Sequence, residues 1–202
     1  MRPSECVGCT AFPCDDVDHR GYAVPGVDVP AEDVRIVLVS EASPPDPADG
    51  YYADGAPLFA RTTLEAFGDA GQRVSTIREL LDLGVYLTTA VKCAKTGYAI
   101  RPATVDACAE ILERELALFP DVRAYLAMGD VAIRALNTVA RRAGEPRPVP
   151  AGSTYRIRGG TYTFRGARVF PSYLQAGPSF YIEKTKRRAI ADDIGRALEL
   201  AR

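Results

Sequence analysis

Four short apolar runs, each bounded by turn-forming residues, alternate with amphipathic stretches along this chain. The runs occupy residues 34–40, 85–91, 123–128 and 168–173. Short runs dominated by Val, Ile, Leu and Ala between turn formers are typical of strands buried on both faces, as in a parallel sheet. The sequence therefore predicts four central strands.

The stretches between the runs have helical spacing. Within residues 104–119 the apolar positions recur at i, i+3 and i+4, and this stripe includes Cys108. A possible capping box, Thr76-x-x-Glu79, opens another helix, and Asp130 is a plausible N-cap. Helices are thus expected at residues 61–70, 76–83, 104–119 and 130–144, with a closing helix from about residue 179.

Strands that alternate with helices predict an α/β fold. We expect a single-domain α/β/α sandwich over residues 1–202, with a central, mostly parallel four-stranded sheet. A small hairpin at residues 155–165, around Gly159-Gly160, and a cysteine-rich amino-terminal segment complete it. With 47% hydrophobic residues the chain can bury a proper core. No apolar run approaches the roughly 20 residues that span a bilayer, and no signal segment opens the sequence, so we expect a cytoplasmic monomer.

Five cysteines raise the question of a metal site. Cys6 and Cys9 form a C-x2-C pair, and fourteen residues separate Cys93 from Cys108. Structural disulfides are rare in the cytosol, so metal ligation is the favoured use of these spaced thiols. Four thiolates hold a [4Fe–4S] cluster or a zinc ion, and the long second spacing favours the cluster. The alternative is that Cys93 and Cys108 are ordinary buried cysteines that bind no metal. Cys14 is expected to lie nearby without binding.

The net charge of −1 conceals an asymmetry. Residues 1–70 hold 13 acidic and 4 basic side chains, whereas residues 145–188 hold 9 basic and 2 acidic ones. A basic zone of this kind predicts a surface that faces phosphates, although solvated loops are an equal alternative. The candidate phosphate-binding side chains are Arg156, Arg158, Lys184, Lys186, Arg187 and Arg188.

Short motifs at the ends of the predicted strands indicate a family. The first strand runs into Ser-Glu-Ala-Ser-Pro at residues 40–44, and Gly-Ala-Pro-Leu-Phe follows at residues 55–59. The second strand ends in Thr-Thr-Ala-Val-Lys-Cys at residues 88–93, and a strand, a glycine and a helix occupy residues 125–135. With the cysteine layout, these motifs resemble the family 4 uracil-DNA glycosylases, the iron–sulfur members of the uracil-DNA glycosylase superfamily.

That resemblance covers nearly the whole chain and implies a function. It implies a glycosylase that acts on DNA in base excision repair, with a structural [4Fe–4S] cluster held by Cys6, Cys9, Cys93 and Cys108. The chain departs from the family in its substrate pocket. Thr89 replaces the family's base-reading Asn, and the third motif, at residues 172–179, lacks the family's histidine. The uracil specificity of the family is therefore not implied for this chain.

Cleavage of an N-glycosidic bond passes through an oxocarbenium-like sugar, so a nearby carboxylate is useful. Glu41, at the end of the first strand, is the natural candidate to orient water and stabilise the developing positive charge. Phe59 is placed to stack on an extruded base, because enzymes that act on bases in duplex DNA flip them out. The alternatives are that Glu41 is a glutamate in a solvated loop and that Phe59 is an aromatic residue of the core.

The departing base needs hydrogen-bond partners as well. Thr89 offers a hydroxyl where an Asn pairs a donor with an acceptor, which weakens discrimination for uracil. Replacement contacts are expected from Gln175, Ser172, Tyr173 and the backbone amides near Ser43, with Gln175 as the catalytic donor. Two other functions stay open: a non-catalytic DNA- or nucleotide-binding protein, and a related hydrolase of nucleosides or RNA. The sequence does not choose between single- and double-stranded DNA.

Overall fold

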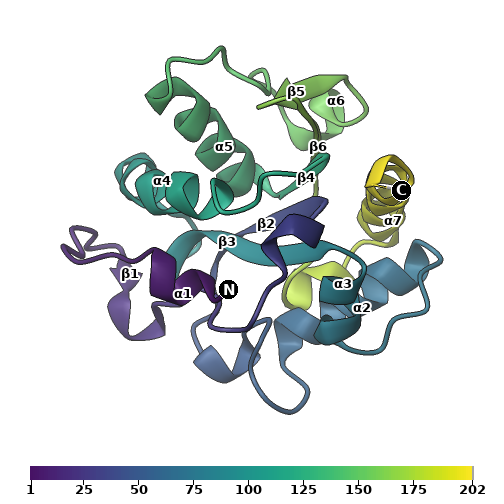
Figure 1. Cartoon of the computed structure of the whole chain (residues 1–202), viewed down its shortest axis with the longest axis horizontal. Coiled ribbons are helices and arrows are strands. Elements are labelled where there is room, and N and C mark those ends of the chain that lie inside the picture. The colour runs from purple at the N-terminus through teal and green to yellow at the C-terminus, as the bar shows by residue number, and fades with distance from the viewer. Residues whose placement is uncertain (202) are drawn as a thin grey trace.

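A six-stranded sheet with helices on both faces organises the computed structural model, which describes residues 1–201 (Figure 1). Arg202, the last residue of the expected domain, lies outside the described residues. The strand order is β1-β3-β2-β4-β6-β5. The strands are β1 (Val17–Asp18), β2 (Ile36–Ser43), β3 (Val85–Lys95), β4 (Ala124–Met128), β5 (Tyr162–Phe164) and β6 (Ala167–Ser172).

The four central strands are parallel, as the apolar runs predict. A short antiparallel strand extends the sheet at each edge, β1 beside β3 and β5 beside β6. Successive residues of β2 face opposite sides of the sheet, because side chains alternate along a strand. Val37 and Val39 belong to one hydrophobic core, and Ile36 and Leu38 belong to the other.

Helices cover both of these cores. In Figure 1, α4 and α5 lie together on one side of the sheet, and α2, α3 and α7 lie on the other. The α-helices are α1 (Pro3–Cys6), α2 (Leu58–Asp69), α3 (Ile77–Asp82), α4 (Pro102–Leu116), α5 (Asp130–Arg142), α6 (Thr154–Ile157) and α7 (Lys184–Ala201). The 3-10 helices are η1 (His19–Gly21), η2 (Ala31–Asp33), η3 (Pro47–Asp49) and η4 (Pro178–Tyr181).

Three local predictions need correction. The hairpin expected at residues 155–165 is instead α6 followed by β5, and β5 turns back into β6 through Arg165 and Gly166, both at positive φ. The closing helix begins at Lys184 rather than near residue 179, because η4 intervenes. The N-cap of α5 is Gly129, and Asp130 is the first helical residue. The Thr76 cap is confirmed, since its hydroxyl accepts from the Glu79 amide.

The amino-terminal segment lies along the β3 edge of the sheet. Val17 pairs with Lys95, and the Ala23 amide donates to the Lys92 carbonyl at 2.8 Å. Asp16 accepts a hydrogen bond from the Arg101 amide at 2.7 Å, at the start of α4. The beginning of the chain is therefore held against its middle. Among residues 1–201, no helix combines the length and the apolar character needed to cross a membrane.

Candidate functional site

The carboxyl ends of β2 and β3 form one side of the candidate site. Ser40 pairs with Thr89, and a shift in register between Ala42 and Ser43 pairs Ser43 with Ala94. Because the strands are parallel, motifs that lie some fifty residues apart in the sequence reach the same edge of the sheet. The strand β2 extends to Ser43, so Glu41 belongs to the strand rather than to the following loop.

A cavity of about 270 Å³ opens at this edge. Ser43, Phe59 and Thr89 line it, together with Tyr51 and Tyr52. Phe59 lies in the first turn of α2, and its ring is 5.5 Å from the ring of Tyr51. The structure therefore brings together three of the residues that the sequence assigned to substrate binding. The cavity is large enough for a nucleobase and is walled by aromatic rings on one side.

Most polar side chains of the cavity wall already have partners. The hydroxyl of Ser43 donates to a backbone carbonyl of β3 at 2.8 Å, and that of Thr88 donates to a buried carboxylate at 2.8 Å. The Tyr51 and Tyr52 hydroxyls donate at 2.8 Å and 3.0 Å. Among the polar side chains that line this cavity within residues 1–201, the hydroxyl of Thr89 is the one left available to a ligand.

Glu41 does not line this cavity, although it lies two residues before Ser43 on the same strand. Its carboxylate accepts a hydrogen bond from Lys95 Nζ at 3.2 Å, and only 15% of its side chain is exposed. Burial raises the pKa of Glu41, and the neighbouring Asp130 adds to this effect, while Lys95 opposes it. A Cβ atom at Gly129, whose φ is +93°, would come within 2.9 Å of the Glu41 carboxylate. Glycine is therefore required where the α5 cap meets this carboxylate.

A buried ion pair supports the same edge of the sheet, and the sequence analysis missed it. Lys92 and Glu115 form a salt bridge with no exposed side-chain surface. Lys92 Nζ also donates to the Thr88 hydroxyl at 2.7 Å and to the Thr89 carbonyl at 2.6 Å. Glu115 accepts from the Tyr86 hydroxyl at 2.7 Å. The available signals were a lysine in an apolar strand and a glutamate near the apolar face of a helix.

Gln175, expected as a catalytic donor, does not line the cavity. It is completely buried, and its Nε2 donates to the Tyr51 hydroxyl at 2.8 Å and to the Thr63 hydroxyl at 3.2 Å. Burial raises the pKa of Tyr51 to about 12. Gln175 therefore fixes a ring of the cavity wall and reaches a ligand only through Tyr51.

The other two third-motif residues also lie away from the cavity. Ser172 is buried at the end of β6, where it pairs with Met128. Tyr173 is partly buried, and the Lys186 ammonium lies 5.5 Å from the centre of its ring. Neither residue is part of the lining around Thr89.

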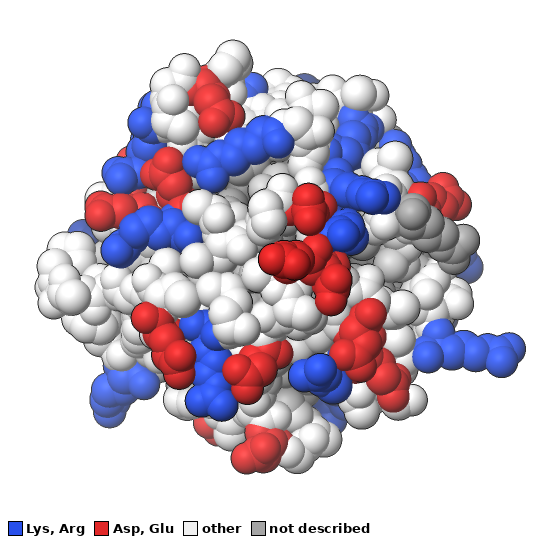
Figure 2. Space-filling view, in the orientation of Figure 1, with Lys and Arg blue, Asp and Glu red and all other residues white. Residues whose placement is uncertain are grey.

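Half of the expected phosphate-binding cations are engaged in ion pairs. Arg158 contacts Asp193 at 2.8 Å, and Lys186 contacts Glu183 at 2.6 Å. Arg187 pairs with two carboxylates of α2. Arg156, Lys184 and Arg188 are in no ion pair with the other residues that the structure describes. Figure 2 shows basic and acidic side chains interspersed on the face it displays, rather than one large basic field.

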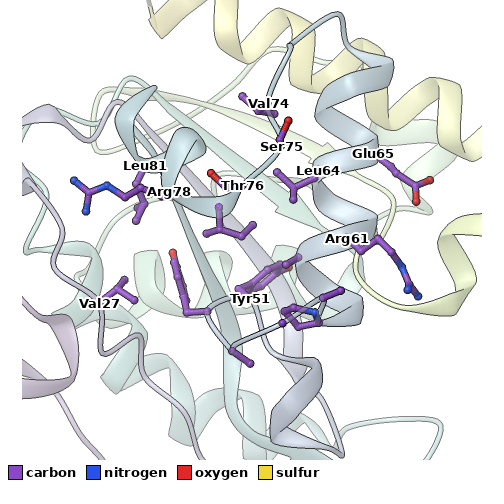
Figure 3. A pocket seen from close by; sticks show the side chains of 17 residues that line it. Val27, Tyr51, Arg61, Leu64, Glu65, Val74, Ser75, Thr76, Arg78 and Leu81 are labelled. Carbon is purple, nitrogen blue, oxygen red and sulfur yellow. The ribbon is translucent and has the colours of Figure 1, made fainter.

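A second and larger cavity, of about 680 Å³, lies on the other side of Tyr51 and Tyr52. Figure 3 shows that Arg61, Glu65 and Arg78 direct their charged ends away from its centre. The interior is thus mainly apolar and offers no charged group to a ligand. The pair of tyrosines forms the partition that bounds the smaller cavity.

Four thiols meet in a third and much smaller cavity, of about 20 Å³. Cys9, Cys14, Cys93 and Cys108 line it. Cys6 does not, because it is exposed at the end of α1, where its sulfur approaches the Arg2 carbonyl at 3.5 Å. The structure therefore groups Cys14 with the other three thiols in place of Cys6. The reason is geometric: α1 turns Cys6 outward, and the following segment carries Cys14 back to β3.

His19, the single histidine of the chain, lies with the thiols rather than at the base-sized cavity. Its Nδ1 is 3.2 Å from the sulfur of Cys93. Burial, with Cys108 nearby, raises the pKa of the Cys93 thiol to about 12. His19 is thus not placed to replace the histidine that the third motif lacks.

The donor set fits an iron–sulfur cluster chemically, since four thiols surround one point of the fold. No three His, Cys, Asp or Glu side chains within residues 1–201 are placed to hold a single metal ion. A four-iron cluster spreads its thiolates further apart than one ion does, because each thiolate binds a different iron. The cavity between the thiols, at about 20 Å³, is smaller than a four-iron cluster.

Comparison with known proteins gives two matches. A family model described as the uracil DNA glycosylase superfamily matches residues 27–194. The type-5 uracil-DNA glycosylase of Thermus thermophilus is 36% identical over 94 residues, which are 46% of this chain. These residues are 43% of that relative, so the similarity spans less than half of its length. The family match includes Cys93 and Cys108 but begins after Cys9 and Cys14.

Proposed function

This chain belongs to the uracil-DNA glycosylase superfamily, and we propose that it removes a deaminated or damaged base from DNA by hydrolysing the N-glycosidic bond. The observation that carries this proposal is the base-sized cavity at the carboxyl edge of β2 and β3, with a shielded carboxylate beside it. The uracil or related base is released in base excision repair, and the product is an abasic site.

The roles of the residues follow from their positions. Phe59 and Tyr51 offer ring faces against which a base extruded from the stack packs. The Thr89 hydroxyl contacts its polar edge. Glu41, two residues before Ser43 on the same strand, orients the attacking water and stabilises positive charge on the sugar. Lys95 holds the Glu41 carboxylate in place through their hydrogen bond.

The same cavity argues for modest selectivity between bases. A single free hydroxyl cannot satisfy both a donor and an acceptor of an imide edge at their full strength. A site of this kind rejects analogues weakly, since strong rejection needs buried polar groups that the wrong ligand leaves unpaired. The Thermus relative is named for uracil, so uracil is the first base to test, followed by other deaminated bases.

The test is an abasic-site assay on single- and double-stranded oligonucleotides that contain uracil, hypoxanthine, xanthine or an alkylated base. We expect the purified protein to convert at least one of these lesions into an alkali-labile abasic site, in duplex DNA or in a single strand. Normal DNA binding without cleavage of any lesion would instead establish a non-catalytic binding protein. Cleavage confined to nucleosides or RNA would establish the related hydrolase.

We also propose that Cys9, Cys14, Cys93 and Cys108 hold a structural [4Fe–4S] cluster. The support for these four ligands is their shared cavity. The resemblance to the iron–sulfur family supports the presence of a cluster, but it implies Cys6 rather than Cys14 as a ligand. The role of such a cluster is to fasten the amino-terminal segment to β3 and α4, since two ligands come from each part. Zinc is the alternative occupant of a set of four thiolates.

Replacing Cys14 by Ser should remove most of the bound iron, because a cluster with three thiolates is held weakly. The Cys6→Ser variant is the matched control and should keep its iron and its broad visible absorption. Iron and sulfide analysis with absorption spectroscopy on both variants checks this. A loss of iron in the Cys6 variant alone would restore the set predicted from the sequence, and a colourless, zinc-loaded wild type would exclude the cluster.

A further inference from the structure

Tyr98 is the most exposed of the large hydrophobic side chains that the structure describes. It lies in the loop between β3 and α4, and 99% of its surface is accessible. An aromatic ring that projects fully into solvent is informative, because burying such a ring is strongly favourable and the chain leaves this one out. The loop is at the carboxyl end of β3, the same edge of the sheet that carries Glu41 and Thr89.

One cation, Lys95, lies over the ring of Tyr98. Lys95 Nζ lies 5.8 Å from its centre, and the same ammonium donates to Glu41 at 3.2 Å. Tyr98 is therefore one side chain away from the proposed catalytic carboxylate.

This combination of an exposed ring and a neighbouring cation matches the chemistry of an opened DNA stack. When a nucleotide is extruded, its former neighbours lose a stacking partner, and an aromatic or apolar side chain that enters the gap replaces it. The Lys95 ammonium beside the ring attracts an adjoining phosphate. A solvent-facing tyrosine elsewhere on the surface, such as Tyr155 on α6, has no cation over its ring within the described residues.

We propose that Tyr98 enters duplex DNA beside the extruded nucleotide and stacks on the exposed neighbouring base. This inference rests on the proposed function, since it assumes that the base-sized cavity receives a nucleotide from DNA. Lys95 keeps the ring at the edge of the cavity and contacts the adjoining backbone.

The experiment measures binding, so that it does not depend on catalysis. Fluorescence anisotropy gives Kd of the full chain for a duplex with a central tetrahydrofuran abasic analogue, which leaves a gap in the stack. We expect Tyr98→Ala to weaken Kd roughly 5- to 150-fold, the range for loss of one base–aromatic stack. Tyr98→Phe keeps the ring and should remain within about 2-fold of wild type. Tyr155→Ala is the matched control and should also remain there.

A second readout separates stacking from charge. The slope of log K against log salt should stay unchanged in Tyr98→Ala, because tyrosine is neutral at pH 7 and releases no counterions.

A Kd of Tyr98→Ala within 2-fold of wild type, an equal loss in Tyr155→Ala, or no binding by the wild type would overturn the proposal. If Tyr98→Ala weakens binding but the wild type cleaves no lesion, the stacking role of Tyr98 is upheld and the glycosylase activity is rejected. If the wild type cleaves a lesion but Tyr98→Ala binds as tightly as wild type, the glycosylase activity is upheld and the stacking role is rejected.

Discussion

Replacing Glu41 by Gln should lower the rate of base release by roughly 10²- to 10⁴-fold, the usual contribution of a positioned general acid or base. The amide cannot carry the negative charge that stabilises an oxocarbenium-like sugar. Single-turnover kinetics on the oligonucleotide that wild type cleaves best measure this step without product release. DNA affinity should change little, because Glu41 does not line the base-sized cavity. A variant that cleaves within about 3-fold of wild type would remove Glu41 from the mechanism.

The pH dependence provides a second check on Glu41. Its pKa is raised, chiefly by burial, and activity needs the ionised carboxylate. The acidic limb of the rate profile should therefore lie above the usual range of glutamate, which is near 4.3. The Asp130→Asn variant tests this assignment, because Asp130 helps to raise the pKa of Glu41. We expect this variant to move the acidic limb to lower pH while the plateau rate stays similar; a limb that does not move would contradict the assignment.

The same raised pKa predicts a gain in stability from the catalytic substitution. A carboxyl whose pKa is higher in the folded than in the unfolded state binds more protons when folded. Its contribution to the free energy of unfolding is therefore lost as the pH rises from the ordinary glutamate range through the folded pKa. At neutral pH the Glu41→Gln protein should be at least as resistant to urea as wild type. A loss of activity in this variant then cannot be attributed to unfolding.

The largest effect on stability is expected from Glu115→Gln, which leaves the buried Lys92 ammonium without its counter-charge. Removing one partner of a buried ion pair costs roughly 3–5 kcal/mol, because the remaining charge stays out of water. The free energy of unfolding, measured by urea denaturation with the m-value monitored, should fall by this amount. A decrease below about 1 kcal/mol would show that Lys92 is hydrated or neutral in the folded protein.

Glu110→Gln is the matched control on the same helix. Its carboxylate is 60% exposed and lies 3.7 Å from Arg142, and exposed pairs of this kind contribute about 0–1 kcal/mol. Because Lys92 Nζ also donates to the Thr89 carbonyl, the Glu115 variant should bind lesion DNA more weakly even where it is still folded. The buried pair thus links the stability of the fold to the position of the cavity wall.

Much of the site was predictable because its residues follow strand ends. The positions of Ser43 and Thr89 follow from the two apolar runs, since parallel strands place their carboxyl ends at one edge. Phe59 lines the same cavity from the first turn of a helix. Gln175 does not line it, because the sequence shows a polar residue after a strand but not the tyrosine and threonine that enclose it.

By itself the sequence determined the alternation of strands and helices, the parallel sheet and the edge at which the candidate site lies. These depend on side-chain periods of about 2 and 3.6 residues, which every short segment carries within itself. The tertiary structure alone decided that Cys14 joins the thiol group in place of Cys6, that Lys92 meets Glu115, and that Arg158 and Arg187 are paired. Such choices depend on distances between segments far apart in the chain, and no local pattern records them.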